Sequence, residues 1–149
     1  MKEQLINMWM RNQLANEQVL DETDEQTQLS DESIKSVYTQ FAHVHTIRYY
    51  NIEKQEKGLL EGLVKLAAKD VGDKELVRSQ LDMSARLIAH LINLDDEFHT
   101  IKGYKNGRIG WIVYLINHES HHRSKAMIQL KKEGVKFSKR LKFDIWNWK

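Results

Sequence analysis

The chain has 149 residues, 41% of them hydrophobic and 30% charged, which suits one soluble domain spanning residues 1–149. Its 23 basic and 21 acidic residues nearly balance, so the clustered basic excess of a nucleic-acid-binding surface is missing. The absence of cysteine excludes disulfides and thiolate metal sites. No apolar run approaches the roughly 20 residues of a membrane span, and the N-terminus lacks the apolar region of a signal peptide, so we expect a cytoplasmic protein.

The chain contains no proline, which favours long helices over a β-rich fold. Hydrophobic spacing predicts helices over residues 3–21, 30–56, 74–93 and 107–133, with a further short helical piece around 59–68. We expect the first helix to end where the polar segment begins at Asp21, and the second to begin near Ser30, with Asp31 and Glu32 in its first turn. Gly134 suits a C-cap. No segment alternates like a strand, so we predict an all-α fold, a four-helix bundle with a short C-terminal tail.

The stretch NHESHHRSK at residues 117–125 has the spacing of a metal site on a helix. His118 and His122 are four residues apart and share one helical face, so both imidazoles can reach one ion. His121 is rotated by about 100° from His122 and is a poorer partner for the same ion. A third histidine from another helix would complete a site with open coordination positions, which is typical of catalytic centres.

Two histidines of the second helix compete for the place of third ligand. The inner stripe of that helix is formed by Ile34, Val37, Tyr38, Phe41, Val44, Arg48 and Ile52. His45 falls inside this stripe, whereas His43 falls nearly opposite it. Because a ligand is expected to face the bundle, the helical wheel favours His45. His90 points away from the stripe of its helix, and His99, in a loop, has no predicted role.

The same stretch also matches H-E-x-x-H, the signature of zinc proteases. In that interpretation His118 and His122 bind zinc and Glu119 is the general base of a hydrolase. No third ligand follows at a recognisable spacing, and no edge strand is predicted that could pair with a peptide. A third interpretation is a bundle whose histidines only form hydrogen bonds in the core.

Several segments together resemble the DinB-like family. The segment YLINHESHHRSKAMIQLKKEGVKF, with the ending DIWNWK, resembles the family's last helix and tail, which often read H-E-x-H-H-R-G-Q and W-x-W. The segment FAHVHTIRYYNIE resembles its second helix, where one subgroup reads H-x-H-N-V-R. HTIKGYKNGRIGWIVYLINHE resembles the approach to the last helix in that subgroup. The other two helices resemble the family only in pattern.

This resemblance implies a four-helix bundle that holds a divalent metal ion, zinc or nickel, through three histidines. Two of them match His118 and His122, and the third comes from the second helix, where alignment of F-A-H-V selects His43 instead of His45. The resemblance also implies a homodimer and thiol S-transferase activity of the bacillithiol or mycothiol type, with a low-molecular-weight thiol and a small electrophile as substrates. The sequence departs from R-G-Q at Arg123-Ser124-Lys125, and Lys125 lies on the face of His118 and His122.

Two charged residues are candidates for catalytic roles. Arg48 lies on the inner stripe one turn beyond His45, where it could pair with Glu119 or bind a carboxylate of the thiol. Glu119 could orient a histidine ligand. The alternatives to thiol transfer are a metal-dependent hydrolase and a non-catalytic, dimeric, stress-related bundle. Trp146 and Trp148 in the tail could cover the mouth of the bundle or pack against helix ends.

Overall fold

The computed structural model describes residues 1–94 and 101–148, and every regular element in these ranges is a helix. The four long helices are α1 (Lys2–Glu25), α2 (Asp31–Gln55), α3 (Lys74–Asn93) and α4 (Gly107–Lys132), and the short ones are η1 (Lys57–Leu60) and α5 (Lys139–Trp146). The prediction of an all-α bundle is confirmed. His99 lies outside the described residues.

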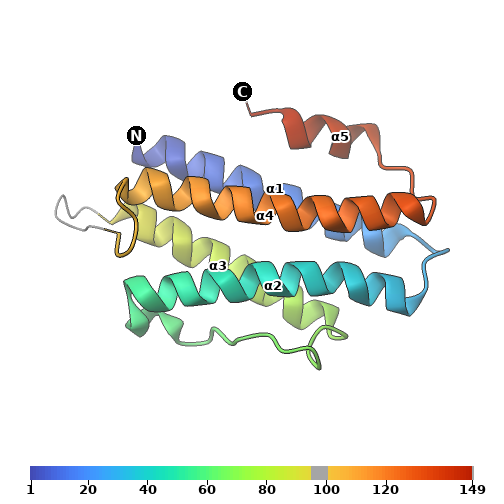
Figure 1. Ribbon diagram of the computed structural model, residues 1–149, viewed down its shortest axis with the longest axis horizontal. Coiled ribbons are helices and arrows are strands. Elements are labelled where there is room, and N and C mark those ends of the chain that lie inside the picture. Colours follow the sequence, from blue (N-terminus) through green and yellow to red (C-terminus); the bar gives the residue numbers. More distant parts are fainter. Residues whose placement is uncertain (95–100, 149) are drawn as a thin grey trace.

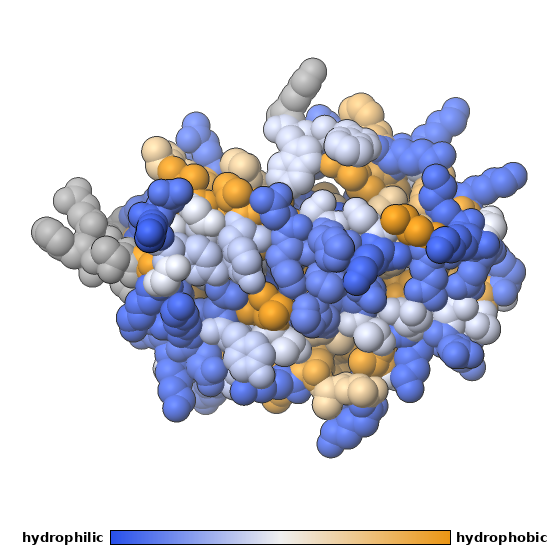
Figure 2. Space-filling model, in the orientation of Figure 1, coloured by the Kyte–Doolittle hydropathy of each residue, from blue (hydrophilic) through white to orange (hydrophobic). Residues whose placement is uncertain are grey.

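The long helices pack side by side around a common core. In Figure 1, α2 and α4 run along the front of the molecule, and α1 and α3 lie behind them. Each long helix has two main neighbours: α2 and α1 both pack against α3 and α4. The α2–α4 face is therefore opposite the α1–α3 face. Figure 2 shows the α2–α4 face in the same orientation as mostly hydrophilic, with separate hydrophobic groups.

The core consists of two hydrophobic clusters with a polar layer between them. One cluster packs near the α1–α2 connection and includes Leu20, Phe41, Val77 and Leu130. The other, towards the opposite end, includes Trp9, Ile52, Ile88, Trp111 and Leu115. The buried polar layer at the middle of the helices consists of Asn12, Gln13, Asn16, His45, Arg48, Ser84, Glu119 and Arg123. Because buried polar groups are costly unless they are paired, this layer must be satisfied by its own contacts.

Helix α1 continues past the polar segment at which we expected it to end. Thr23 is buried, and its hydroxyl donates a hydrogen bond to the Val19 carbonyl one turn earlier. The Asp24 carboxylate accepts hydrogen bonds from Lys74 and Tyr38. Tertiary contacts of the polar side chains therefore stabilise the last turn, which their helix propensity alone did not predict.

The ends of α2 and α4 follow their capping residues. The Ser30 hydroxyl accepts a hydrogen bond from the Ser33 backbone N–H at the start of α2. After α4, Gly134 has φ +86°, and the backbone N–H of Val135 donates to the Leu130 carbonyl, which is the Schellman arrangement. The prediction of Gly134 as a C-cap is confirmed.

The prediction of a helical piece around residues 59–68 is wrong. Only η1 forms, and the chain then runs to α3 without a regular element. Gly62, at φ +79°, takes the left-handed conformation that a helix does not use. The backbone of Val64 bonds instead to side chains of the bundle: its N–H donates to Gln80 Oε1, and its carbonyl accepts from His45 Nε2.

The C-terminal tail packs along α1. Nε and Nη2 of Arg11 donate to the Asn147 carbonyl at 3.0 and 2.7 Å, and Gln18 donates to the Asp144 carboxylate. Trp146 is 83% exposed, so its ring is not used as a cover over the core. None of the described helices has the length and apolar character that crossing a membrane requires.

Candidate metal centre

Three histidines from two helices meet on the α2–α4 face. His43 comes from α2, and His118 and His122 come from α4; each offers a ring nitrogen, and these nitrogens lie within 4.8 Å of one another. The ring centroid of His122 lies 4.4 Å from that of His43 and 4.6 Å from that of His118. Such a group could hold a metal ion.

One pair of ring nitrogens has the spacing of metal ligands. Nε2 of His118 lies 3.3 Å from Nε2 of His43. Two imidazole nitrogens at about 2.05 Å from one tetrahedral zinc ion are separated by about 3.3 Å. A direct hydrogen bond from a ring N–H is most often shorter, roughly 2.9–3.0 Å. This pair therefore has the spacing of two ligands of one divalent ion, and His122, within 4.8 Å of both, could supply a third nitrogen. Three protein ligands leave a position for an external molecule.

The surroundings of the Nδ1 atoms indicate which ring nitrogen of each histidine is available to a metal ion. Nδ1 of His122 lies 2.8 Å from Oε1 of Gln40. Because an amide oxygen only accepts, Nδ1 carries the hydrogen and Nε2 keeps a free lone pair. Nδ1 of His118 is buried and has no hydrogen-bond partner among the described residues. An unpaired buried nitrogen costs free energy, and such atoms occur where a group serves a functional site.

Two of these rings, those of His118 and His122, are in surroundings that favour the neutral imidazole. Burial lowers the pKa of His118, and the neighbouring His43 lowers it further. Burial also lowers the pKa of His122 to about 4, with added contributions from His43, His118 and His121. Neutral rings at physiological pH are the form that binds metal ions.

The structure does not bring His45, which the helical wheel favoured, to this group; the α2 histidine that lies with His118 and His122 is His43. His45 is buried in the polar layer. Its Nε2 donates to the Val64 carbonyl at 2.7 Å, and its Nδ1 lies 3.1 Å from the Ser84 hydroxyl. Burial lowers the pKa of His45 to about 4, and with both nitrogens engaged it is a neutral, satisfied core histidine.

The two histidines lie on different flanks of α2. On the flank of α2 that faces α4, Gln40 contacts His122 and Asn51 contacts Trp111. His43 lies on this flank. His45 lies on the flank that faces α3, where it contacts Ser84. A helical wheel shows where the core is, but it cannot show which neighbour each flank meets. The histidine group sits at the outer edge of the α2–α4 contact, and its α2 member, His43, is exposed.

Arg48 and Glu119 form a buried ion pair in the polar layer. Nε and Nη2 of Arg48 donate to the two oxygens of Glu119, each at 2.7 Å. Nη1 of Arg48 donates to Gln13 and to the Leu81 carbonyl, and the guanidinium lies 4.7 Å from the centre of the Trp9 ring. The pairing of Arg48 with Glu119 considered from the sequence is thus present, and it joins α1, α2, α3 and α4.

Two asparagines of α1, which the sequence analysis missed, complete this pair. Asn12 and Asn16 donate their amide N–H groups to Oε2 of Glu119, and their oxygens accept from Nη1 of Arg123. Burial lowers the pKa of Arg123. Because Arg48 and the asparagines occupy both oxygens of Glu119, this carboxylate is not free to act as the general base of an H-E-x-x-H hydrolase. A signal was available, since Asn12 and Asn16 are four apart like His118 and His122.

Aromatic side chains line one end of the histidine group. The ring of Tyr114 lies nearly parallel to that of His118, at an interplanar angle of 20° and a centroid distance of 6.2 Å. Tyr104 follows, with its centroid 5.6 Å from that of Tyr114. The Tyr104 hydroxyl and the Trp111 indole N–H both donate to Oδ1 of Asn51. The contacts with Asn51 fix the positions of Tyr104 and Trp111.

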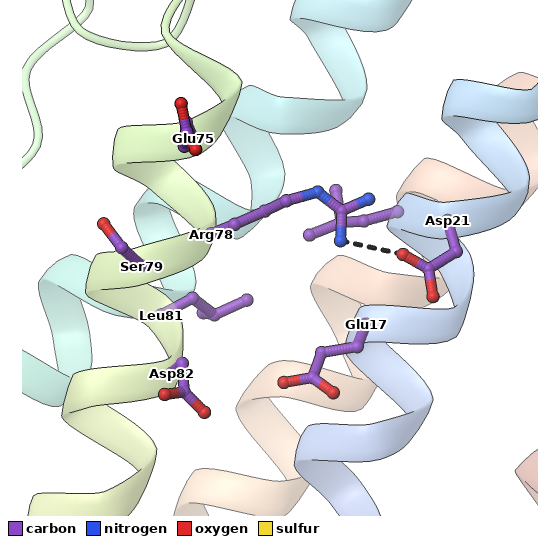
Figure 3. A pocket seen from close by; sticks show the side chains of 8 residues that line it. Glu17, Asp21, Glu75, Arg78, Ser79, Leu81 and Asp82 are labelled. Atoms are coloured by element: carbon purple, nitrogen blue, oxygen red, sulfur yellow. Dashed lines mark hydrogen bonds and ion pairs between the residues drawn. The ribbon is translucent and has the colours of Figure 1, made fainter.

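A separate hollow of about 340 Å³ lies between α1 and α3, on the opposite side of the bundle. Glu17, Asp21, Glu75 and Asp82 line it together with Arg78. Arg78 reaches across it to Asp21 at 2.8 Å, as Figure 3 shows, and also pairs with Asp24. Its lining carries no buried polar atom that lacks a partner in the described chain, so the histidine group is the stronger candidate site.

Comparison of the chain with protein-family models, with curated proteins and with solved structures found no match. The resemblance to the DinB-like family stays a prediction that rests on the motifs of the second and last long helices.

Proposed function

We propose that His43, His118 and His122 bind one divalent metal ion, zinc or nickel, and that this centre activates a small thiol for transfer to an electrophile. The observation that supports the proposal is the meeting of three ring nitrogens within 4.8 Å. Imidazole nitrogen suits both metals, and three protein ligands leave room for an external one. Thiol transfer follows the resemblance of the histidine motifs to the DinB-like family.

A bound divalent ion lowers the pKa of a coordinated thiol, which then reacts as a thiolate at neutral pH. The chain holds the ligands in place for this chemistry. Gln40 fixes the ring of His122 through its 2.8 Å contact. The Arg48–Glu119 pair and its asparagines hold α4 against α1 and α2, so that His118 and His122 face His43. Tyr114 packs against one side of the site.

Metal content of the untagged protein tests the centre. After loading with zinc or nickel and desalting, we expect about one ion per chain in the wild type. His43→Ala, His118→Ala and His122→Ala should each lose it. His90→Ala, at an exposed position of α3, is the matched control and should retain it. Full retention by His43→Ala, or no ion in the wild type, would overturn the proposal.

Thiol transfer is tested separately with 2-mercaptoethanol and 1-chloro-2,4-dinitrobenzene. In this reaction a carbon–sulfur bond forms, chloride leaves, and the thiol proton passes to water. The metal-loaded wild type should accelerate the reaction above its rate in buffer, and chelation or His122→Ala should abolish the acceleration. A loaded protein without any acceleration would contradict thiol transfer while leaving the metal centre intact.

A further inference from the structure

The side of α4 that carries the three-histidine group also carries a lysine that forms no ion pair with the described residues. Lys125 is exposed and follows His122 by three residues and His118 by seven, so it lies on the same helical face. No carboxylate of the described residues lies within ion-pair distance of it. His121, also exposed, has its ring 5.2 Å from that of His122.

Among the described residues, no carboxylate forms an ion pair with Lys125 or with the three histidines. Glu119 is the acidic group whose charge acts on His118, and Arg48 neutralises it in a bidentate pair on the core side of α4. Lys125 acts on His122 in the opposite sense, and its charge adds to the effect of burial in lowering the pKa of that ring. Three neutral imidazoles also leave the charge of a divalent ion uncompensated.

The two ends of the site differ in character. At one end Tyr114 presents an aromatic ring, 44% exposed, beside His118. At the other end stand Lys125 and His121. A ligand held at the centre would therefore place its apolar part towards Tyr114 and any negative group towards Lys125.

Resting on the proposed metal centre, we propose that its external ligand is a small anion, a thiol that carries a carboxylate, and that Lys125 binds this carboxylate. The ion would hold the sulfur and Lys125 the second charge, so the two contacts would orient the molecule along the α2–α4 face. Lys125 is in this sense a residue that determines specificity, whereas the three histidines determine only that a metal-binding donor is present.

The test uses the full chain loaded with Co²⁺, whose visible spectrum reports binding of a thiol. Three thiols of similar size serve as probes: 3-mercaptopropionate is anionic, 2-mercaptoethanol neutral and cysteamine cationic. Their dissociation constants are compared between wild type, Lys125→Gln and Lys125→Glu. Differences in intrinsic thiol affinity cancel when the same thiol is compared between variants. Lys131→Gln, an exposed lysine on another side of α4, is the matched control.

We expect Lys125→Gln to raise the dissociation constant of 3-mercaptopropionate by about twofold to fivefold, as for the loss of an exposed ion pair. The dissociation constant of 2-mercaptoethanol should not change. Lys125→Glu should weaken the binding of 3-mercaptopropionate further and strengthen the binding of cysteamine. Added salt should reduce each difference in affinity between variant and wild type. Unchanged anion preference in both Lys125 variants, with thiols still perturbing the spectrum, would overturn the role of Lys125 and leave the metal centre standing. Absence of a cobalt spectrum in the wild type would overturn both.

Discussion

The polar side chains on the two sides of α4 differ in how they are paired. On the core side, Glu119 and Arg123 are buried, and their charged groups are bound by Arg48, Asn12 and Asn16. On the outer side, the neighbouring residues His118, His122 and Lys125 have few partners of their own. Nδ1 of His118 has none among the described residues, and Lys125 forms no ion pair there.

If the proposed metal centre is correct, this difference separates polar groups that the fold needs from polar groups that bind an external molecule. A polar group that the fold needs is satisfied by the fold, because leaving it unpaired in the interior is costly. A polar group that serves an external molecule is left incomplete until that molecule binds. The core side should therefore control stability, and the outer side should control binding with little effect on the stability of the metal-free protein.

Removing the buried carboxylate should have the largest effect. Glu119→Ala leaves Arg48 and Arg123 buried without a counter-charge, and we expect it to lower the free energy of unfolding by about 3–5 kcal/mol. Urea unfolding in the presence of a chelator measures it. Glu133→Ala, at an exposed position of α4's C-terminal end, should change stability by no more than about 0.5 kcal/mol. A loss under about 1 kcal/mol for Glu119→Ala would contradict the structural assignment of this side.

A double replacement sharpens the same comparison. Arg48→Met with Glu119→Met removes both charges of the pair. It leaves Arg123 buried without its counter-charge, whereas Glu119→Ala leaves both arginines so, and the double variant should therefore cost less than Glu119→Ala alone. Thermal unfolding of the single and double variants in chelator decides the point. A double variant less stable than Glu119→Ala would mean that the pair itself, rather than the penalty of separating it, stabilises the bundle.

The next effect is a pH dependence caused by His45. Burial lowers the pKa of His45 from 6.5 to about 4, so the unfolded chain takes up a proton at higher pH than the folded one. The stability that this ring contributes is complete above pH 6.5 and is lost as the pH falls towards 4, about 3 kcal/mol in all. Unfolding free energies of wild type and His45→Gln in chelator should converge over this interval. His122 titrates similarly in both proteins, so parallel curves would contradict the role of His45.

The smallest of these effects tests the support of the metal ligands. Gln40→Ala removes the acceptor that holds Nδ1 of His122 and should weaken zinc binding by about tenfold to a hundredfold. Its effect on the stability of the metal-free protein should stay within about 1 kcal/mol, because the contact is only part-buried. Competition with a zinc chelator measures the affinity, with Ser36→Ala, one turn earlier on the same flank, as control. Equal affinity in Gln40→Ala and Ser36→Ala would show that the ring needs no such support.

Periodicity and capping predicted much of the fold. The third long helix was expected over residues 74–93 and is α3, Lys74–Asn93, because its apolar stripe and its Asp73 cap agree. The end of α1 was missed, since its stability comes from Lys74 and Tyr38, which are distant in sequence. The helical piece around 59–68 failed because long-range bonds to His45 and Gln80 replace the helical ones.

The candidate site was predicted in part, for a similar reason. The spacing of His118 and His122 is local, and the structure brings both to the site. The choice between His43 and His45 depends on how α2 is rotated relative to α3 and α4, which no local pattern encodes. The motif F-A-H-V pointed to His43, and the assumption that a ligand faces the core pointed to His45.

The bonds of Val64 have a consequence for the order of folding. Between η1 and α3 the chain has no regular element, and at Val64 it is held from both sides by His45 of α2 and Gln80 of α3. Neither side chain is in position until the two helices have docked. We therefore expect the α2–α3 connection to become ordered late in folding and to open early when the native protein unfolds locally.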